Sequence, residues 1–177
     1  MAVLPIRTFP DPGLKVSTPF VSHLTPKIVR MIDELIETMR AHPRCVGLAA
    51  PQVGWNARIA VADATGHPKA AKTHGLVVLI NPRILAQDGQ AIQREGCLSV
   101  PDLTGNVPRA ARLRVQALDA SGATWTQWFD GFEAIVMQHE IDHLDGKLFL
   151  DRVANLKSDV FRRKTYWFPT NRPERLK

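Results

Sequence analysis

Apolar residues recur at helical spacing after Thr25-Pro26, a favoured helix start because Thr caps the first turn and Pro suits its first position. The apolar positions lie three or four residues apart, so they share one face that we expect to be buried. Pro43 ends the pattern. The sequence therefore predicts an amphipathic helix, whose buried face consists of Ile28, Ile32, Leu35, Ile36 and Met39.

Strand patterns follow this helix. An exposed loop is expected from Pro68 to Gly75, and the turn sequence Asp119-Ala120-Ser121-Gly122 predicts a hairpin. A helix, several mainly antiparallel strands and a second helix together indicate the α+β class. The predicted strands are residues 58–62, 76–80, 113–118 and 124–129.

A second helix is predicted to begin at Asp130, as N-cap, with Glu133 completing a variant of the capping box. Gly146 suits a left-handed C-terminal cap. Three apolar residues precede His139 by seven, four and three positions, so they extend its side of the helix as an apolar strip. This strip is either core or an apolar surface beside the histidine. Its members are Phe132, Ile135 and Val136.

The second helix carries His139-Glu140-Ile141-Asp142-His143. Residues four apart lie one above the other on a helix, so His139 and His143 can hold one ion between them. Glu140 stands beside the first histidine, where it can take a proton from water on that ion. Such patterns also arise on ordinary solvated helices, so the motif alone does not decide for a metal site.

A catalytic site of this type needs a third protein ligand. The extended motif that ends in a third histidine matches as far as Gly146, but its last position is Phe149. Upstream, Cys97 offers a soft thiolate ligand, although most free cysteines are simply small buried hydrophobes. Downstream carboxylates also stay open as the third ligand, and these are Asp145, Asp151, Asp159 and Glu174.

Three separated segments carry a family resemblance. They are Val46-Gly47-Leu48-Ala49-Ala50-Pro51-Gln52, Glu95-Gly96-Cys97-Leu98-Ser99, and Gln138-His139-Glu140-Ile141-Asp142-His143-Leu144-Asp145-Gly146. In order and spacing they resemble the peptide deformylase family, metalloenzymes that remove the formyl group from the initiating methionine of new bacterial and organellar proteins. The resemblance covers about residues 3 to 155. One departure is Cys45, which stands where the first motif usually begins with Gly.

The resemblance implies that Cys97, His139 and His143 bind one divalent transition metal per chain. Fe(II) is the ion expected from the family, and Zn, Ni or Co would suit the same donors. Glu140 would act as general base and then as general acid toward the leaving amine. The implied fold has small, mainly antiparallel sheets packed around the metal-binding helix.

The resemblance also implies substrate contacts. The backbone N–H of Leu98 and the side-chain amide of Gln52 would stabilise the formyl oxygen as it gains charge. The backbone at Gly47 would hold the substrate chain extended. Arg109 is either a surface arginine or a partner of Glu95 that braces the Cys97 loop. A methionine pocket would be lined by Val46, Phe132, Ile135 and Val136.

Composition fits one compact domain, residues 1–177, because 45% of the 177 residues are hydrophobic. Two cysteines do not make a secreted disulfide framework. No apolar run approaches the roughly 20 residues that span a bilayer. The first residues lack a secretory signal, so we expect a cytoplasmic protein of bacterial type; a mature organellar form would carry the same features.

Charge is concentrated at the end of the chain. The net charge is +6, and residues 152–177 contain eight Lys or Arg and two acidic residues. We expect this segment to be a basic helix or tail, with aromatic residues at 166–168. It could contact ribosomal RNA, and binding to DNA or a membrane is not expected. The basic residues that would dock are Arg162, Arg163, Lys164, Arg172, Arg175 and Lys177.

Three functions are therefore compared. The first is a deformylase acting on N-formylmethionyl nascent polypeptides and releasing formate. The second is a broader metallopeptidase with the same helix motif, which would cut internal peptide bonds. The third is an RNA-binding module with an incidental metal, which would keep its function if Glu140 were lost.

Overall fold

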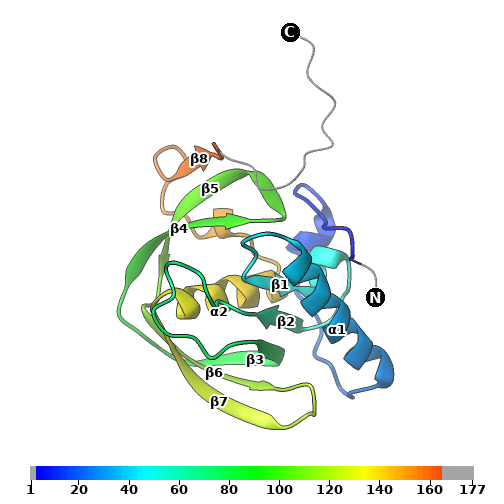
Figure 1. The fold of residues 1–177 in the computed structure, drawn as a ribbon. Helices are drawn as coiled ribbons and strands as arrows, with labels where there is room; N and C mark the ends of the chain where they lie inside the picture. The colour runs from blue at the N-terminus through cyan, green and yellow to red at the C-terminus, as the bar shows by residue number, and fades with distance from the viewer. Residues whose placement is uncertain (1–2, 165–177) are drawn as a thin grey trace.

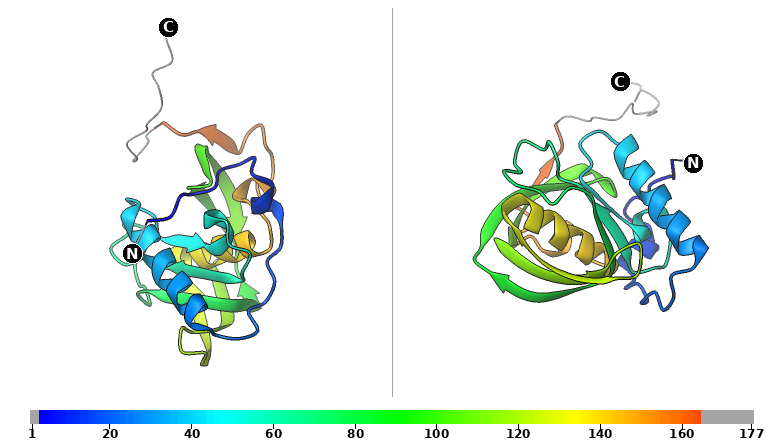
Figure 2. Two further views of the ribbon diagram at one scale, coloured as in Figure 1. Left: turned by 90° about the vertical axis from the view of Figure 1, so that its right-hand side faces the viewer. Right: turned by 60° about the horizontal axis from the view of Figure 1, so that its bottom comes forward.

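The computed structural model describes residues 3–164. Helix α2 (Gly131–Leu144) lies between two antiparallel sheets, and helix α1 (Pro26–Ala41) packs outside them (Figures 1 and 2). This confirms the predicted α+β class with a central helix that carries the histidine motif.

Two sheets form the walls around α2. The larger has the strand order β1-β2-β3-β6-β7 and the smaller has the order β4-β5-β8, with every pair antiparallel. The larger sheet contains β1 (Gly47–Ala49), β2 (Ile59–Ala62), β3 (Val77–Asp88), β6 (Arg112–Leu118) and β7 (Thr124–Asp130). The smaller contains β4 (Ala91–Cys97), β5 (Val100–Arg109) and β8 (Val160–Arg162). Short 3₁₀ helices are η1 (Pro12–Lys15), η2 (Ala50–Val53) and η3 (Phe149–Asp151).

Helix α2 is buried on nearly all sides, as expected for a helix enclosed by sheets. From Glu133 to Leu144 every residue is buried except His139, which is partly exposed. Apolar side chains of α2 and of the larger sheet form one core cluster, which includes Leu79, Val115 and Phe129. The polar residues of α2 are therefore held in a dry interior, where each needs a partner or a function.

The N-terminus of α2 begins where predicted but is capped differently. Asp130 is the N-cap residue, but its side chain makes no capping hydrogen bond. Arg112 lies directly opposite Asp130 in the β6–β7 ladder and draws the carboxylate away, with Arg112 Nε 2.6 Å from Asp130 Oδ1. Glu133 accepts hydrogen bonds from His74 instead, so the predicted capping box is wrong although the helix boundary is right.

The end of α2 follows the prediction. Gly146 has φ of +70°, and its N–H donates to the carbonyl of His143 while Lys147 N–H donates to that of Asp142. These two bonds form the Schellman arrangement that ends a helix. A Cβ at Gly146 would lie 2.8 Å from the backbone of Lys15, so the close approach of the N-terminal segment also requires glycine here.

Helix α1 is confirmed. Thr25 Oγ1 accepts a hydrogen bond from the N–H of Ile28 at 3.3 Å, and Pro26 occupies the first position. The predicted face packs against β1 and β2, and its residues form a second core cluster with the apolar side chains of those strands. Two members, Ile28 and Ile36, are only partly buried. Met31 and Thr38 are buried members of this face that the prediction omitted.

The predicted strands are present, and so is the hairpin turn, where Gly122 N–H donates to the carbonyl of Asp119. Strand β3 runs beyond the predicted residue 80 as far as Asp88, with an irregularity in its pairing with β6. Strand β5 was not predicted; it contains Pro101 and Pro108, and proline is uncommon within a paired strand.

The basic C-terminal segment forms no helix in its described part, residues 152–164, and contributes β8 instead. The aromatic residues at 166–168 lie outside the described residues, as do Arg172, Arg175 and Lys177. Within residues 3–164, no helix is long and apolar enough to cross a membrane.

Candidate functional site

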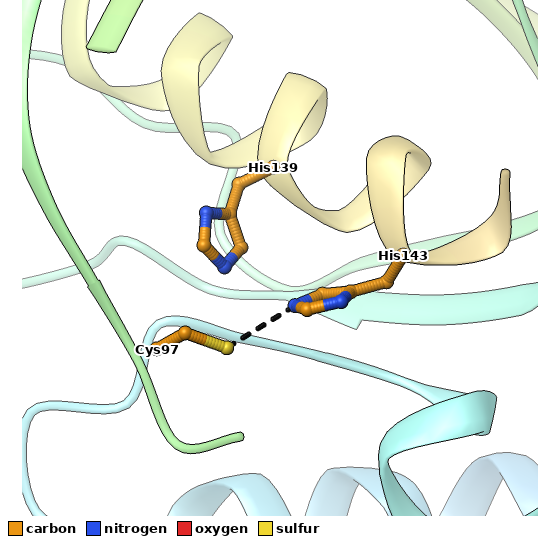
Figure 3. A group of neighbouring side chains, drawn as sticks. All are labelled: Cys97, His139 and His143. Carbon is orange, nitrogen blue, oxygen red and sulfur yellow. Dashed lines mark hydrogen bonds between the residues drawn. The ribbon is translucent and has the colours of Figure 1, made fainter. Parts of the chain in front are cut away.

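One thiol and two imidazoles meet between α2 and the end of β4. The candidate ligand atoms of Cys97, His139 and His143 all lie within 4.8 Å of one another, and Cys97 Sγ is 3.2 Å from His143 Nε2 (Figure 3). The histidines come from successive turns of α2, as the motif predicts. Cys97 closes β4 where the pairing with β5 shifts register, which turns the chain out of the ladder beside α2.

The charges of this group favour a thiolate. Burial alone would raise the pKa of Cys97, but His143 and His139 outweigh it and hold that pKa well below its ordinary value. Burial would lower the pKa of His139, yet its hydrogen bonds to Cys97 and Glu95 raise it well above the usual range. A thiolate is the form that binds a metal, so the site is electrostatically prepared for a cation.

Glu95 orients the first histidine. His139 Nδ1 lies 2.8 Å from Glu95 Oε2, which leaves Nε2 to face the other two candidate ligands. Arg109 holds Glu95 through two bonds, of 2.7 Å to Oε1 and 3.0 Å to Oε2. Burial would raise the pKa of Glu95, but Arg109 and His139 lower it to about 2. Of the two interpretations of Arg109, the bracing partner of Glu95 is confirmed and the surface arginine is wrong.

The same arginine extends the network to α2. Arg109 Nη1 donates to Asp142 Oδ2 at 2.5 Å, and Arg152 Nη2 donates to Asp142 Oδ1 at 2.6 Å. Asp142 is the residue before His143, so this bridge fixes the helix turn that carries the second histidine. Neither Asp142 nor Arg152 was given a role from the sequence. The sequence identifies Asp142 as a carboxylate on a helix expected to be buried, which needs a cationic partner, but no local pattern shows which cation that is.

Glu140 is buried beside the triad without a full set of partners. Its Oε2 has no hydrogen-bond partner in the structure. Burial raises its pKa to about 7, against the lowering effects of His139 and His143. Gly47 makes room for the carboxylate, because a Cβ at that position would overlap Glu140 Oε1. A buried carboxylate that is left unpaired at a cavity is suited to exchange protons.

Gln52 is oriented toward the thiolate. Its Oε1 accepts from the N–H of Ala49 at 2.9 Å, so its amide nitrogen points into the site. That nitrogen donates to Cys97 Sγ at 3.3 Å and to Ser99 Oγ at 3.1 Å. Ser99 also donates its backbone N–H to Cys97 Sγ at 3.4 Å. The role of Ser99 in holding the sulfur was not predicted.

A cavity of about 230 Å³ opens beside these groups. Glu140, His139 and Cys97 line it, and so do all the residues that the sequence assigned to the substrate. Phe132 is stacked against His67, with the rings parallel and their centres 4.2 Å apart. The predicted substrate and oxyanion residues that line the cavity are Val46, Gly47, Gln52, Leu98, Phe132, Ile135 and Val136.

Cys45 also lines this cavity, but it differs from Cys97. Burial, Glu140 and Cys97 raise the pKa of Cys45 to about 12, against a lowering by its own bond to Gly47. Its Sγ donates to the carbonyl of Gly47 at 3.1 Å. The thiol that stands in place of the usual glycine is therefore protonated and bonded to the loop.

The alternative third ligands have other partners. Asp145 pairs with Arg58 at 2.8 Å, Asp151 pairs with Lys15 at 2.5 Å, and Asp159 accepts from the N–H of Asn155. Glu174 lies outside the described residues. Within the described chain, Cys97, His139 and His143 form the one group of three or more such side chains placed to hold an ion.

The donor set fits a divalent transition metal. One thiolate and two imidazoles are borderline donors that suit Zn, Fe, Co or Ni. Three protein ligands leave a coordination position for water or substrate, as catalytic sites require. The oriented His139 and the unpaired Glu140 supply the supporting groups that such a site needs.

The family described as polypeptide deformylase matches residues 3–159. The chain belongs to this family. The peptide deformylase of Alkalilimnicola ehrlichii is 44% identical over 164 residues, which cover 93% of this chain and 89% of the relative. Peptide deformylase 2 of Vibrio cholerae is 40% identical over 97% of this chain and 99% of the relative.

Solved deformylase structures share the fold. The crystal structure of peptide deformylase from Ehrlichia chaffeensis in complex with actinonin has a TM-score of 0.82 and 36% identity, over 89% of this chain and 92% of that one. The Thermotoga maritima deformylase has a TM-score of 0.80 and 35% identity, over 88% of this chain and 100% of that one. The family resemblance and the fold expected from it are therefore confirmed.

We expect Arg109→Ala to lower the free energy of unfolding by about 3–5 kcal/mol, because it leaves buried carboxylates without their shared cation. Chemical denaturation would measure this loss. The control is Arg112→Ala, which removes an exposed pair with Asp130 and should cost about 0–1 kcal/mol. Equal losses in the two variants would mean that the buried network does not hold the site together.

Proposed function

We propose that this chain removes the N-formyl group from the initiating formyl-methionine of newly made polypeptides and releases formate. The observation that carries the proposal is the buried, unpaired carboxylate of Glu140 between the Cys97-His139-His143 group and a cavity that is lined in part by apolar side chains. Family membership supports the same reaction, and it does not favour the broader peptidase or the RNA-binding module.

Cys97, His139 and His143 would hold the metal, and Fe(II) is the ion we propose, with Zn, Ni or Co suiting the same donors. When bound, the ion would supply Lewis acidity that makes the attacking water more acidic and polarises the formyl carbonyl. The protein supplies orientation, because Glu95 fixes the ring of His139 and Asp142 fixes the turn before His143.

Glu140 would move the proton. Its carboxylate accepts a proton from the attacking water as the water oxygen bonds to the formyl carbon. The C–N bond then breaks, and Glu140 returns the proton to the leaving amine. The products are formate and a peptide with a free methionine amine. A carboxyl whose pKa is raised to about 7 by burial is suited to both halves of this exchange.

Gln52 and Leu98 would stabilise the oxygen that gains negative charge. The amide nitrogen of Gln52 already points toward Cys97 Sγ, and its orientation is fixed from behind by Ala49. Leu98 lines the cavity directly after Cys97, so its backbone N–H is the second proposed donor. Donors fixed before the reaction stabilise the transition state without a cost of reorganisation.

The cavity would select the substrate. A formyl carbon carries only hydrogen beyond its oxygen and nitrogen, so a tight space at the triad admits it and excludes an acetyl group. This cavity is lined by Val46, Phe132, Ile135 and Val136, which would receive the flexible methionine side chain. Gly47 would hold the substrate backbone in extended form at the edge strand β1.

Residues 1–177 would act as a single catalytic domain, in the cytoplasm. The basic segment that begins at Arg152 would contact ribosomal RNA, where formylated chains emerge. Support for that contact is the charge of the segment, which includes exposed Arg162 and Lys164 in its described part.

The proposed ligand set predicts one transition metal per chain and its loss in Cys97→Ala. The same loss is expected in His139→Ala and His143→Ala. Metal analysis of purified protein would measure it. Cys45→Ala is the matched control, because it removes the other thiol of the cavity and should keep the metal. Full occupancy in Cys97→Ala would place the third ligand elsewhere.

Glu140→Gln separates metal binding from turnover. The amide keeps the size of the side chain but cannot accept the proton, so kcat should fall by about 10²–10⁴ while metal content stays unchanged. Asp33→Asn, a matched change on the exposed side of α1, should leave both unchanged. Normal turnover in Glu140→Gln would remove Glu140 from the mechanism.

The reaction itself is tested on one peptide sequence that carries either a formyl or an acetyl group. We expect the metal-loaded protein to release formate from formyl-Met-Ala-Ser and to leave acetyl-Met-Ala-Ser and casein uncut. Formate assay and mass spectrometry would follow both. Equal rates on the two acyl groups, or cleavage of internal bonds, would contradict deformylation and favour the broader metallopeptidase.

A further inference from the structure

The accessible charges at the mouth of the cavity are all positive. Glu95 and Glu140, the acidic residues of its lining, are buried, and Glu95 is paired with Arg109. His67 adds little charge, because burial and then Lys69 and Arg44 lower its pKa. The cations of the lining are Arg44, Lys69, Arg94 and Arg163.

Arg163 is built into the wall next to the triad. Its backbone N–H donates to the carbonyl of Asp102 at 2.8 Å, which continues the pairing of β8 with β5 by one residue. Its guanidinium lies on Gly96, where any Cβ would overlap Nη2. Gly96 directly precedes Cys97, so the fold keeps a glycine where the arginine head approaches the site.

The Arg163 guanidinium has hydrogen-bonding capacity to spare. Its Nε is buried without a hydrogen-bond partner, and the described residues provide no ion pair for it. A desolvated guanidinium N–H without an acceptor is unfavourable, and a carboxylate matches the guanidinium fork with two parallel bonds.

Arg94 is held close by in a fixed position. Its Nε donates to Thr104 Oγ1 at 2.9 Å, and its guanidinium lies 3.5 Å from the ring centre of Phe161. Phe161 lies in β8, and Arg163 directly follows that strand and is still bonded to β5 through Asp102, so the two side chains project from the same side. Arg94 is therefore oriented by neighbours that leave its remaining N–H groups available to a ligand.

We infer that Arg163, with Arg94, forms a carboxylate-binding subsite that makes the chain prefer formylated peptides with an acidic residue at the first or second position after the methionine. This inference rests on the proposed function. The triad and the cations line the same cavity, and an extended chain advances only about 3.3–3.6 Å per residue. A peptide whose formyl group lies at the triad therefore brings its next side chains past Arg163, Arg94, Lys69 and Arg44.

The first test uses the unaltered, metal-loaded protein and C-terminally amidated peptides. We expect formyl-Met-Glu-Ala-amide, formyl-Met-Ala-Glu-amide or both to exceed the matching Gln peptides in kcat/KM by roughly 5- to 30-fold at low salt. The ratio should shrink as ionic strength rises. Equal values for Glu and Gln at both positions would overturn the inference.

A second arm compares formyl-Met-Ala-Gln with a free and an amidated C-terminus. An advantage confined to the free C-terminus would identify the terminal carboxylate as the ligand and overturn side-chain selectivity. Formate release from none of the peptides would instead contradict the proposed function itself.

Charge reversal distinguishes recognition from a structural role of Arg163. Arg163→Gln should bring the ratio of kcat/KM between the Glu and Gln peptides close to one. Arg163→Glu should make a matching peptide with Lys in place of Glu a better substrate than the Glu peptide. Arg114→Gln is the control, since it removes one exposed positive charge outside the cavity and should leave the ratio unchanged.

Ribosomal RNA is the competing ligand for these cations. If both Arg163 variants weaken binding to ribosomal RNA while the peptide ratio is unchanged, Arg163 serves nucleic acid and the inference is wrong. Should either variant fail to fold by circular dichroism, Arg94→Gln provides the same comparison of peptides, and an unchanged ratio there would count against the subsite.

Discussion

A chain of opposite charges, buried except at its Arg152 end, holds this site in place. It runs from Arg152 through Asp142, Arg109 and Glu95 to His139, and it joins the end of the small sheet to the central helix. Removing so many charges from water is costly, and only mutual pairing at 2.5–3.1 Å makes it tolerable. The interaction therefore fixes the relative positions of β4, β5 and α2, on which the meeting of Cys97 with the two histidines depends.

The contrast between Glu95 and Glu140 follows from their partners. Both carboxylates are buried near His139. Arg109 and His139 outweigh the effect of burial on Glu95 and lower its pKa to about 2, whereas burial without such partners raises the pKa of Glu140 to about 7. One carboxylate stays charged and positions a ring. The other can gain and lose a proton, and Gly47 provides the space that brings it to the cavity.

Much of this arrangement could be predicted from the sequence, because local patterns determine it. The spacing of His139 and His143 places them on one face of α2, and Gly146 ends that helix as expected. The capping box failed because Arg112, distant in sequence but adjacent across the hairpin, attracts Asp130 more strongly than the helix N-terminus does. Long-range pairing of this kind leaves no local pattern, and the same holds for Asp142 and Arg152.

The pairing register of strand β4 determines both which residues support the triad and which residues are exposed at the cavity. Alternate residues of a strand face opposite sides, so Glu95 and Cys97 are buried toward α2 while Arg94 and Gly96 are exposed. A shift of one residue in its pairing with β5 would exchange these sets. It would remove the brace of His139 and the thiolate from the site together. The register that places Cys97 is thus the same one that places Arg94 against Phe161 and opens Gly96 to Arg163. We therefore expect a substitution that alters this ladder to change metal binding and the proposed recognition of acidic side chains together.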